Sequence, residues 1–430
     1  MITVNALKHG SILVAIWAIA NAQPSSRADP QDVLVRVAAK LAVTEKRIPN
    51  FTCVETVTRD YYQPASTLPR ACSVLLEERK RRTKDLILRH LATDRLRLDV
   101  TMMRTGELFS WVGARNFDDK GIEHLVRDGP LGSGAYGAFL QLVFLQDVKE
   151  FVFERNLVSG GHNLMEYSFR VNRSDSHYRV KLDKSWIYTA YSGTFQLDPK
   201  SEEVFEMNLQ EDDLPDSSDY CTTITSAKFH TVQIANVRFV MSARAVQRFV
   251  YGNGEEIENT TTFANCREYL GESTISFSQD SEPKPGGSKG PPPEKLGSVP
   301  AGLRFAFALT SPIESDTAAA GDPFAGKLTE PLLDGKHKVF AQVGSLVEGR
   351  LLRVQSFQFP REEVVIILKP ETVEISGAKV PLSAVRDFPA TGPRKIILPL
   401  PDEEHSGVFL VAGQHITVKK GFRSAWRTVE

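Results

Sequence analysis

The chain lacks the short motifs that mark the commonest enzyme and metal sites. It contains no GxSxG sequence of serine esterases, no HExxH sequence of zinc proteases and no CxxC pair. Its nine histidines lie singly along the chain and form no metal-ligand pattern. We therefore predict no catalytic residue, no cofactor site and no metal site, and keep a hydrolase only as a third, less favoured class of function.

The chain also lacks an excess of charge of either sign. Its 52 lysines and arginines are balanced by 53 aspartates and glutamates, which leaves a net charge of -1. Proteins that bind nucleic acids or anionic membranes usually carry a basic excess, so the balance predicts neither class. A basic run at residues 79–84 is flanked by acidic residues, and we interpret it as a solvated surface.

Long apolar runs are confined to the start of the chain. Residues 12–19 are apolar, follow Lys8 and precede Ala20-Asn21-Ala22, which has the small-x-small form of a signal-peptidase site. The run is shorter than the ~20 residues that span a bilayer, so we predict a cleaved signal peptide over residues 1–22 rather than an anchor. We expect an exported protein, periplasmic or extracellular, with no transmembrane span after cleavage.

Cysteine is scarce but even in number. Cys53, Cys72, Cys221 and Cys266 would all enter an oxidising compartment after export. Three pairings are possible. We favour Cys53 with Cys266 and Cys72 with Cys221, because the first and last strands of a sheet domain often lie together and the second pair then nests inside the first. Four buried free thiols are the alternative.

Alternating strand patterns fill most of the chain. A predicted helix begins at Pro30 and ends before Pro49, and residues 50–62 then alternate as a half-buried strand does. Further strand patterns at 71–113 and 149–280, with short turns, predict an antiparallel meander. The predicted fold is mainly β with a few helices: residues 29–280 form a curved antiparallel sheet, or half-barrel, with N-terminal and inserted helices.

Residues 117–147 interrupt these strands. The pattern of apolar residues predicts two helices here, at residues 120–127 and 135–145, and the second is strongly apolar. The sequence GSGAYG at 132–137 matches GxGxxG, but no βαβ pattern surrounds it, so we interpret it as a glycine-rich turn.

A second domain follows a predicted linker. Residues 281–300 are dense in proline, glycine, serine and lysine, and cannot form a core. Residues 301–430 show short strand patterns, among them 394–400, and predict a smaller all-β barrel or sandwich.

Several segments together resemble a family of exported acidobacterial proteins with no assigned activity: PNFTC at 49–53, LFSW at 108–111, GTFQLDP at 193–199 and CREYLGES at 266–273. More remotely, the order of elements over residues 29–280 is similar to the half-barrel of periplasmic lipoprotein carriers such as LolA. That resemblance implies a curved sheet holding an apolar cavity capped by helices. Residues 299–333 and 344–354 resemble the β-barrel of outer-membrane core subunits of type IV secretion.

Aromatic residues of the N-terminal domain are candidates for lining such a cavity, with an ordinary core as the alternative: Phe109, Trp111, Phe139, Phe144 and Phe153. The leading hypothesis is a non-enzymatic envelope protein that binds an apolar small molecule, a lipid or a protein segment, with residues 135–145 as the lid. The alternative is a structural component of an envelope assembly that docks to other envelope proteins through its C-terminal β domain.

Overall fold

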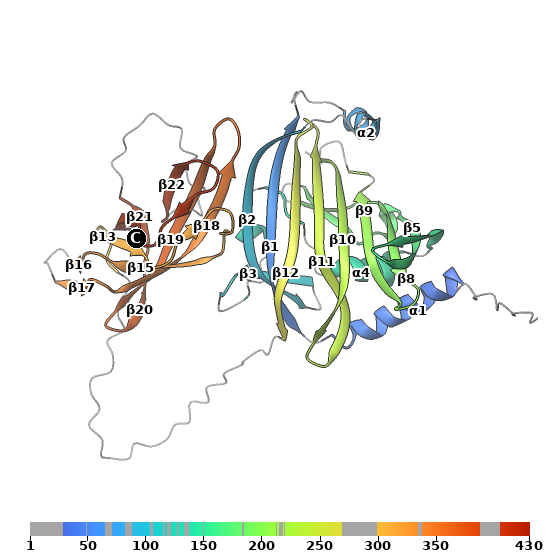
Figure 1. The fold of residues 1–430 in the computed structure, drawn as a ribbon, viewed down its shortest axis with the longest axis horizontal. Coiled ribbons are helices and arrows are strands. Elements are labelled where there is room, and N and C mark those ends of the chain that lie inside the picture. Colours follow the sequence, from blue (N-terminus) through green and yellow to red (C-terminus); the bar gives the residue numbers. More distant parts are fainter. Residues whose placement is uncertain are drawn as a thin grey trace, which may run out of the picture.

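The computed structural model describes residues 29–268, 299–387 and 405–430, apart from residues 49, 65–70, 82–87, 104–105, 115–116, 118–121, 127–128, 133–136, 149, 183–184, 212, 215–217, 219 and 334–337. The predicted signal peptide, most of the predicted linker and the predicted strand at 394–400 lie outside the described residues. Within them the prediction of a mainly β fold with few helices is confirmed (Figure 1).

One large antiparallel sheet forms the N-terminal domain. β1 (Phe51–Pro64) lies inside it, between β2 (Leu88–Met103) and β12 (Glu256–Glu268), so the strand predicted at residues 50–62 is a central strand of the sheet. The strands follow one another across the sheet in the order β3 (Gly106–Trp111), β2 (Leu88–Met103), β1 (Phe51–Pro64), β12 (Glu256–Glu268), β11 (Val237–Tyr251), β10 (Tyr220–Ile234), β9 (Glu203–Glu211), β8 (Tyr191–Asp198), β5 (His162–Val171) and β4 (Val152–Ser159). A small separate hairpin consists of β6 (Arg179–Leu182) and β7 (Ser185–Tyr188).

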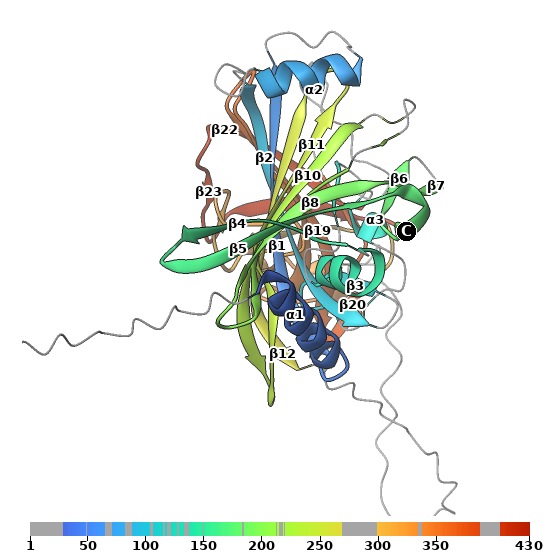
Figure 2. The same ribbon diagram turned by 90° about the vertical axis from the view of Figure 1, so that its right-hand side faces the viewer.

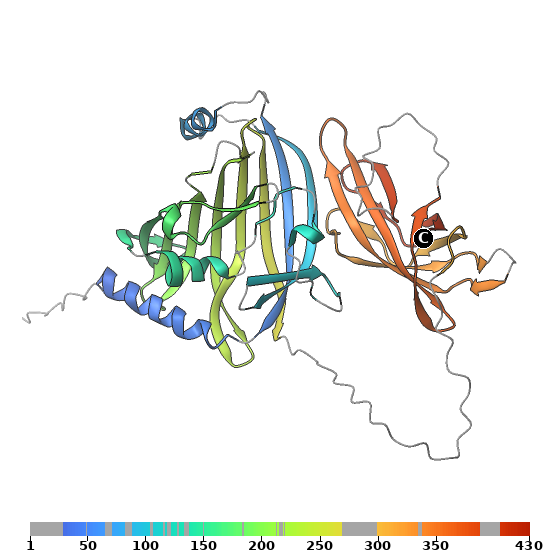
Figure 3. The same ribbon diagram turned by 180° about the vertical axis from the view of Figure 1, so that it is seen from behind.

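Helices cover the concave side of this sheet, which Figures 2 and 3 show from the edge and from behind. α1 (Pro30–Glu45) begins at Asp29, whose side chain accepts a hydrogen bond from Gln31 N at 2.8 Å as an N-cap does. Its buried stripe is Val33, Leu34 and Val37. The other short helices on this side are α3 (Ile122–Leu125), α4 (Ala138–Gln141) and the π-helix η1 (Leu142–Asp147). A 3-10 turn, η2 (Arg173–Asp175), follows β5.

The sequence prediction was wrong for one strand and inexact for two helices. Residues 72–81, predicted to open as a strand, form helix α2 (Cys72–Arg81), because Leu, Glu and Arg favour a helix and the segment does not alternate. The helix predicted at 120–127 is described only as the short α3. The helix predicted at 135–145 is α4 continued by η1. Among the described residues, no helix has both the length and the apolar character needed to cross a membrane.

The C-terminal domain is also antiparallel β, and its described residues contain no helix. Its main sheet runs in the order β21 (Ala384–Arg386), β24 (Arg423–Thr428), β13 (Arg304–Leu309), β15 (Pro323–Leu328), β18 (Leu346–Phe357) and β19 (Glu363–Ile375). β20 (Ala378–Pro381) and β22 (Gly407–Ala412) both pair with β19. Short pairs are β14 (Ile313–Glu314) with β23 (Thr417–Val418), and β16 (Leu332–Leu333) with β17 (Val339–Ala341).

The second domain joins the first along the outer edge of β2. β3 covers only residues 98–103 of that strand. Arg97 N donates to Ala320 O at 2.7 Å, and Ala320 N donates to Arg95 O at 2.8 Å. β18 then pairs with residues 92–94, and Gln358 N donates to Leu91 O at 2.7 Å. The edge of β2 is therefore paired along most of its length, and the C-terminal domain extends the N-terminal sheet (Figure 1).

Gly321 is the tightest point of this junction, and we expect Gly321→Ala to loosen it. Its φ is +101°, and an added Cβ would lie 2.2 Å from Arg97 O and 2.8 Å from Trp111 Cε3. Gly302→Ala is the matched control, since Gly302 has φ +87° but nothing within 4 Å of the added Cβ. We expect Gly302→Ala to cost about 1 kcal/mol for the left-handed backbone and Gly321→Ala about 1–3 kcal/mol more. Amide hydrogen exchange at Arg97 and Ala320 measures the loosening, and equal exchange in both variants would contradict it.

Candidate binding site

Two of the predicted lining residues lie together on the concave side of the sheet. Phe139 in α4 and Phe144 in η1 are buried in one apolar cluster with the stripe of α1 and with side chains of β5, β8 and β9. The Phe144 ring meets the Phe195 ring edge to face at 4.8 Å between centroids. α1 and η1 thus cover this apolar part of the concave face, and the Tyr167 hydroxyl of β5 also donates to Pro30 O at the start of α1 at 2.7 Å.

The other three predicted lining residues lie elsewhere. Phe109 and Trp111 point from β3 into a second apolar cluster, which contains Cys53. Phe153 lies on the edge strand β4, is 37 % exposed and contacts Tyr167 edge to face. The structure therefore divides the predicted set between two buried clusters and the sheet edge.

The upper part of the same concave face is polar. In the strand pairing, Thr225, Gln247, Asn259, Arg59 and Asp94 lie side by side on β10, β11, β12, β1 and β2. Residues directly opposite one another in an antiparallel sheet share a face, so these five side chains form one row across the concave side. We call this row the polar band. All its members are buried except Gln247, which is half-buried.

The charges of the polar band compensate each other. Arg59 Nε donates to Asp94 Oδ1 at 2.7 Å, and Nη2 donates to Oδ2 at 2.6 Å. Arg59 is 3 % exposed and Asp94 6 % exposed, and Tyr61 donates to Asp94 Oδ2 at 3.2 Å. A two-point contact of this kind is needed to offset the desolvation of both ions. The positive charge of Arg59 cancels the negative charge of Asp94, so the polar band has no net charge.

A glycine-containing segment, residues 129–132, lies over the polar band, and we call it the strap. Its Pro130 carbonyl accepts a hydrogen bond from Asn259 Nδ2 at 2.9 Å. A Cβ added to Gly132 would lie 1.6 Å from Gln247 Oε1, so the strap approaches the band too closely for a larger residue without a movement of Gln247. The glycine-rich turn predicted at 132–137 therefore begins in contact with the band, while its residues 133–136 lie outside the described ones.

Asn259 is left with an acceptor that nothing in the described part of the chain uses. Because a carbonyl can only accept, the contact with Pro130 fixes the nitrogen of the amide toward the strap and the oxygen away from it. Asn259 is 2 % exposed, and its Oδ1 has no hydrogen-bonding partner among the described residues. An unmet acceptor at this depth is costly unless water or a ligand meets it.

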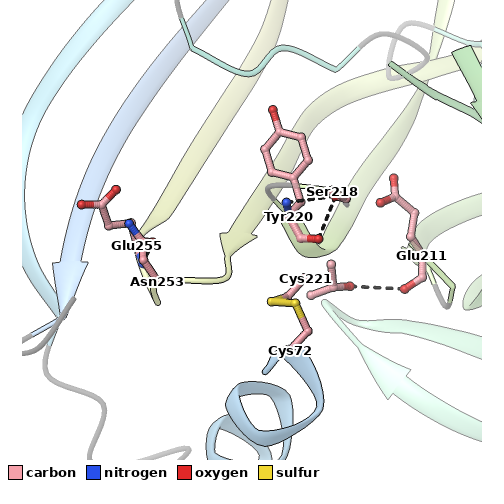
Figure 4. Close-up of a disulfide and its surroundings, with 8 residues drawn as sticks. Cys72, Glu211, Ser218, Tyr220, Cys221, Asn253 and Glu255 are labelled. Carbon is pink, nitrogen blue, oxygen red and sulfur yellow. Dashed lines mark hydrogen bonds between the residues drawn. A yellow bond between two sulfur atoms is a disulfide. The ribbon is translucent and has the colours of Figure 1, made fainter. Parts of the chain in front are cut away.

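A second buried acceptor lies on β9, two residues beyond the row of the polar band. It is nearer the end of the sheet to which α2 is attached, which we call the rim. Glu211 is 6 % exposed, and its Oε2 also lacks a partner among the described residues. Burial raises the pKa of Glu211 from 4.5 to about 7, although hydrogen bonds with Thr223 and Tyr178 lower it. Figure 4 shows Glu211 near the Cys72–Cys221 disulfide at the rim, where Thr222 Oγ1 donates to its backbone carbonyl at 3.3 Å.

Glu211 is expected to make the stability of the domain depend on pH. Its carboxyl releases a proton near pH 4.5 in the unfolded chain but near pH 7 in the folded protein, so the fold holds the proton more tightly. The free energy of unfolding should therefore fall by about 3 kcal/mol as pH rises from 4.5 to above 7. Urea unfolding across this range tests it. Glu211→Gln should flatten that decline, whereas Glu203→Gln, at the other end of β9, should retain it.

A pair of tyrosines, the buried Tyr191 and the half-buried Tyr178, connects Glu211 to the end of η1. Tyr178 and Tyr191 have ring centroids 5.5 Å apart, and Tyr191 donates to Asp147 Oδ2 at 2.9 Å. Asp147 Oδ1 also lies 2.6 Å from His177 Nδ1. Burial raises the pKa of both tyrosines, so both remain hydroxyl donors. These contacts attach the last residue of η1 to the sheet. The described residues contain no group of three or more histidine, cysteine or acidic side chains arranged to hold a metal ion.

The structure contains the disulfides Cys53–Cys266 and Cys72–Cys221, and no described cysteine is free. The first joins β1 to β12 beneath the second apolar cluster. The second attaches α2 to β10 at the rim (Figure 4).

Sequence reasoning missed the polar band. Its members are scattered from residue 59 to residue 259 and only the strand register brings them together. One signal was present, since Arg59 occupies the apolar phase of its strand with Phe51, Cys53 and Val57. A charged residue in that phase must be paired when it is buried.

Comparisons with known proteins leave the family open. No protein-family model matches the chain, and no curated protein matches it, so the acidobacterial resemblance gains no support. A similar solved structure is a Vibrio parahaemolyticus domain that its name links to outer membrane lipoprotein sorting. It is 9 % identical, with a TM-score of 0.27, and the match covers 57 % of this chain and 96 % of that one. A likeness this distant transfers neither a fold nor a function.

Proposed function

We propose that this chain is a non-enzymatic, exported binding protein that holds an apolar ligand, a lipid or an apolar protein segment on the concave face of its N-terminal sheet. The observation that carries the proposal is the composition of that face. One part is an aromatic-rich cluster covered by α1 and η1, and another part is the polar band with a buried acceptor left unmet among the described residues. Apolar sites with a few convergent polar groups are typical of ligand binding.

The cover over the apolar part is attached by weak contacts at its outer side. Arg36 pairs with Glu202 at 2.5 Å and Lys40 with Glu203 at 3.4 Å, and both cations are more than 40 % exposed. Exposed ion pairs contribute about 0–1 kcal/mol each. η1 is a π-helix, a form that is rare and found frequently at functional sites. Asp147 holds the end of η1 to β8, so α1 is the part of the cover with weak outer contacts, and its movement away from the sheet would expose the aromatic cluster.

Native mass spectrometry of the exported full-length protein tests the proposal directly. We expect a co-purified apolar molecule or peptide that organic extraction removes. Phe144→Leu should reduce the bound fraction roughly three- to tenfold, because leucine offers the ligand less apolar surface than phenylalanine does. Phe409→Leu is the matched control, because Phe409 is equally buried but lies in the C-terminal domain, and it should leave the bound fraction unchanged. A ligand-free protein, or an equal reduction in both variants, would overturn the proposal.

The alternative, docking of an envelope assembly through the C-terminal domain, receives no specific support. Among the described residues, that domain makes its main contact with β2 of its own chain. Two disulfides fit an exported protein, whichever of the two functions applies.

A further inference from the structure

We infer that the polar band binds an uncharged group that donates several hydrogen bonds, such as the hydroxyls of a sugar, at the polar end of the ligand. This inference rests on the proposed function and specifies the head group that the site takes. Among the described residues, Asn259 Oδ1 in the band and Glu211 Oε2 in the next row have no hydrogen-bonding partner. The amide oxygen of Asn259 can only accept, so its partner must donate, whereas the Glu211 carboxyl, with its pKa raised to about 7 by burial, accepts when ionised and donates when protonated, and a hydroxyl suits both forms.

The polar groups around Asn259 offer hydrogen-bond acceptors to a ligand. Asn259 Nδ2 is already used by the Pro130 carbonyl, which leaves the oxygen as the free function of the amide. Thr225 and Thr261 lie on the same face as Asn259, and both are buried. Hydroxyls can both donate and accept, so they complement ligand hydroxyls in either sense.

Charge argues against an ionic head group. The carboxylate of Asp94 is already held at two points by Arg59, within a buried pair. A phosphate at the band would meet the Asp94 carboxylate with no unused cation in the band, and an ammonium at the band would have to compete with Arg59 for Asp94. Either ion would also lose its hydration without a new counter-charge. A neutral donor avoids both costs.

The spacing suits a group with several hydroxyls rather than a single one. Asn259 lies on β12 and Glu211 on β9, with β11 and β10 between them and an offset of two residues along the strand, which places the two residues about 16 Å apart at the usual strand spacings. Gln247, Tyr61 and Ile257 on this face are half-buried, so solvent reaches the face beside the strap. A ligand group can therefore approach the band from the rim.

The test compares amphiphiles that share one chain and differ in the head. Full-length protein freed of ligand is titrated by calorimetry with dodecyl maltoside, dodecylphosphocholine and dodecyl phosphate below their micelle concentrations, and with maltose alone. We expect dodecyl maltoside to bind at least about fivefold more tightly than the two other amphiphiles, which is the free energy of one or more hydrogen bonds.

Asn259→Leu should abolish that preference while leaving the binding of dodecylphosphocholine unchanged. Asn208→Leu, on the opposite face of the sheet at β9, is the matched control and should retain the preference.

The outcomes separate the two proposals. Equal affinity for the three amphiphiles, unchanged by Asn259→Leu, would overturn the head-group inference and leave the proposed function standing. Failure of every amphiphile to bind, together with a native mass spectrum that shows no co-purified molecule or peptide, would overturn the proposed function instead. If dodecyl maltoside binds and free maltose does not, the natural ligand resembles a glycolipid, with its sugar attached to an apolar chain. If maltose alone binds equally well, the source is a free saccharide, and the apolar part of the proposed function is wrong.

Discussion

Removal of the Cys53–Cys266 disulfide, as Cys53→Ala with Cys266→Ala, is expected to lower the free energy of unfolding by about 4 kcal/mol or more. The two disulfides are nested, with sequence separations of 213 and 149 residues. With the inner one intact, the outer one closes a ring of about 64 residues, the difference of the two separations. The conformational entropy that such a ring removes from the unfolded state gives the expected value.

The Cys72–Cys221 pair is the control, because its removal opens the same ring and costs only about 0.3 kcal/mol less chain entropy, since it leaves the larger loop. Cys53 is fully buried in the second apolar cluster, whereas Cys72 lies half-buried at the rim. Any destabilisation for the Cys53 pair that exceeds that for the Cys72 pair by more than this difference therefore measures the packing of the cluster. Chemical denaturation of both double variants gives the two values, and a smaller destabilisation for the Cys53 pair would contradict the expected order.

Replacement of Arg59 by leucine is expected to cost about 3–5 kcal/mol, because it leaves the Asp94 carboxylate buried without its counter-charge. Addition of Asp94→Leu should recover most of that stability, since a well-packed apolar pair avoids both desolvation costs. Urea unfolding of the single and double variants forms a cycle that isolates the pair.

Arg155→Leu is the matched control for this charge pair. Arg155 contacts Glu166 at 3.0 Å, but its side chain is 67 % exposed, so its removal should change stability by no more than about 0.5 kcal/mol. Similar destabilisation by Arg59→Leu and Arg155→Leu would show that Asp94 is adequately hydrated without Arg59, and that the polar band is less isolated from solvent than its burial indicates.

The fold could be predicted from local patterns because most of its elements follow the period of their own residues. Residues 50–62 alternate and form β1, and Asp29-Pro30 opens α1 as the capping pattern indicates. Residues 72–81 are difficult to assign from sequence because an apolar start, Cys72 to Leu76, suits either a strand or a short helix. A disulfide at its first residue ties this helix to β10.

The candidate site could be predicted only in part, because it depends on contacts between distant segments. Aromatic composition pointed to Phe139 and Phe144, which do lie under α1. It could not separate them from Phe109, since both groups are apolar and only the register assigns each to its cluster. The polar band needed the pairing of Arg59 with both Asp94 and Asn259, residues that lie far apart in sequence.

The junction at β2 has a consequence for biosynthesis. During synthesis, the first domain emerges with the lower-numbered part of β2 unpaired along its outer edge, since Ala320 and β18 follow it by more than two hundred residues. A bare strand edge is a template for pairing with any other chain that offers one. Fragments of the protein that end within residues 269–298 would thus keep this unpaired strand edge and associate into oligomers. In the full-length protein the C-terminal domain pairs with this edge.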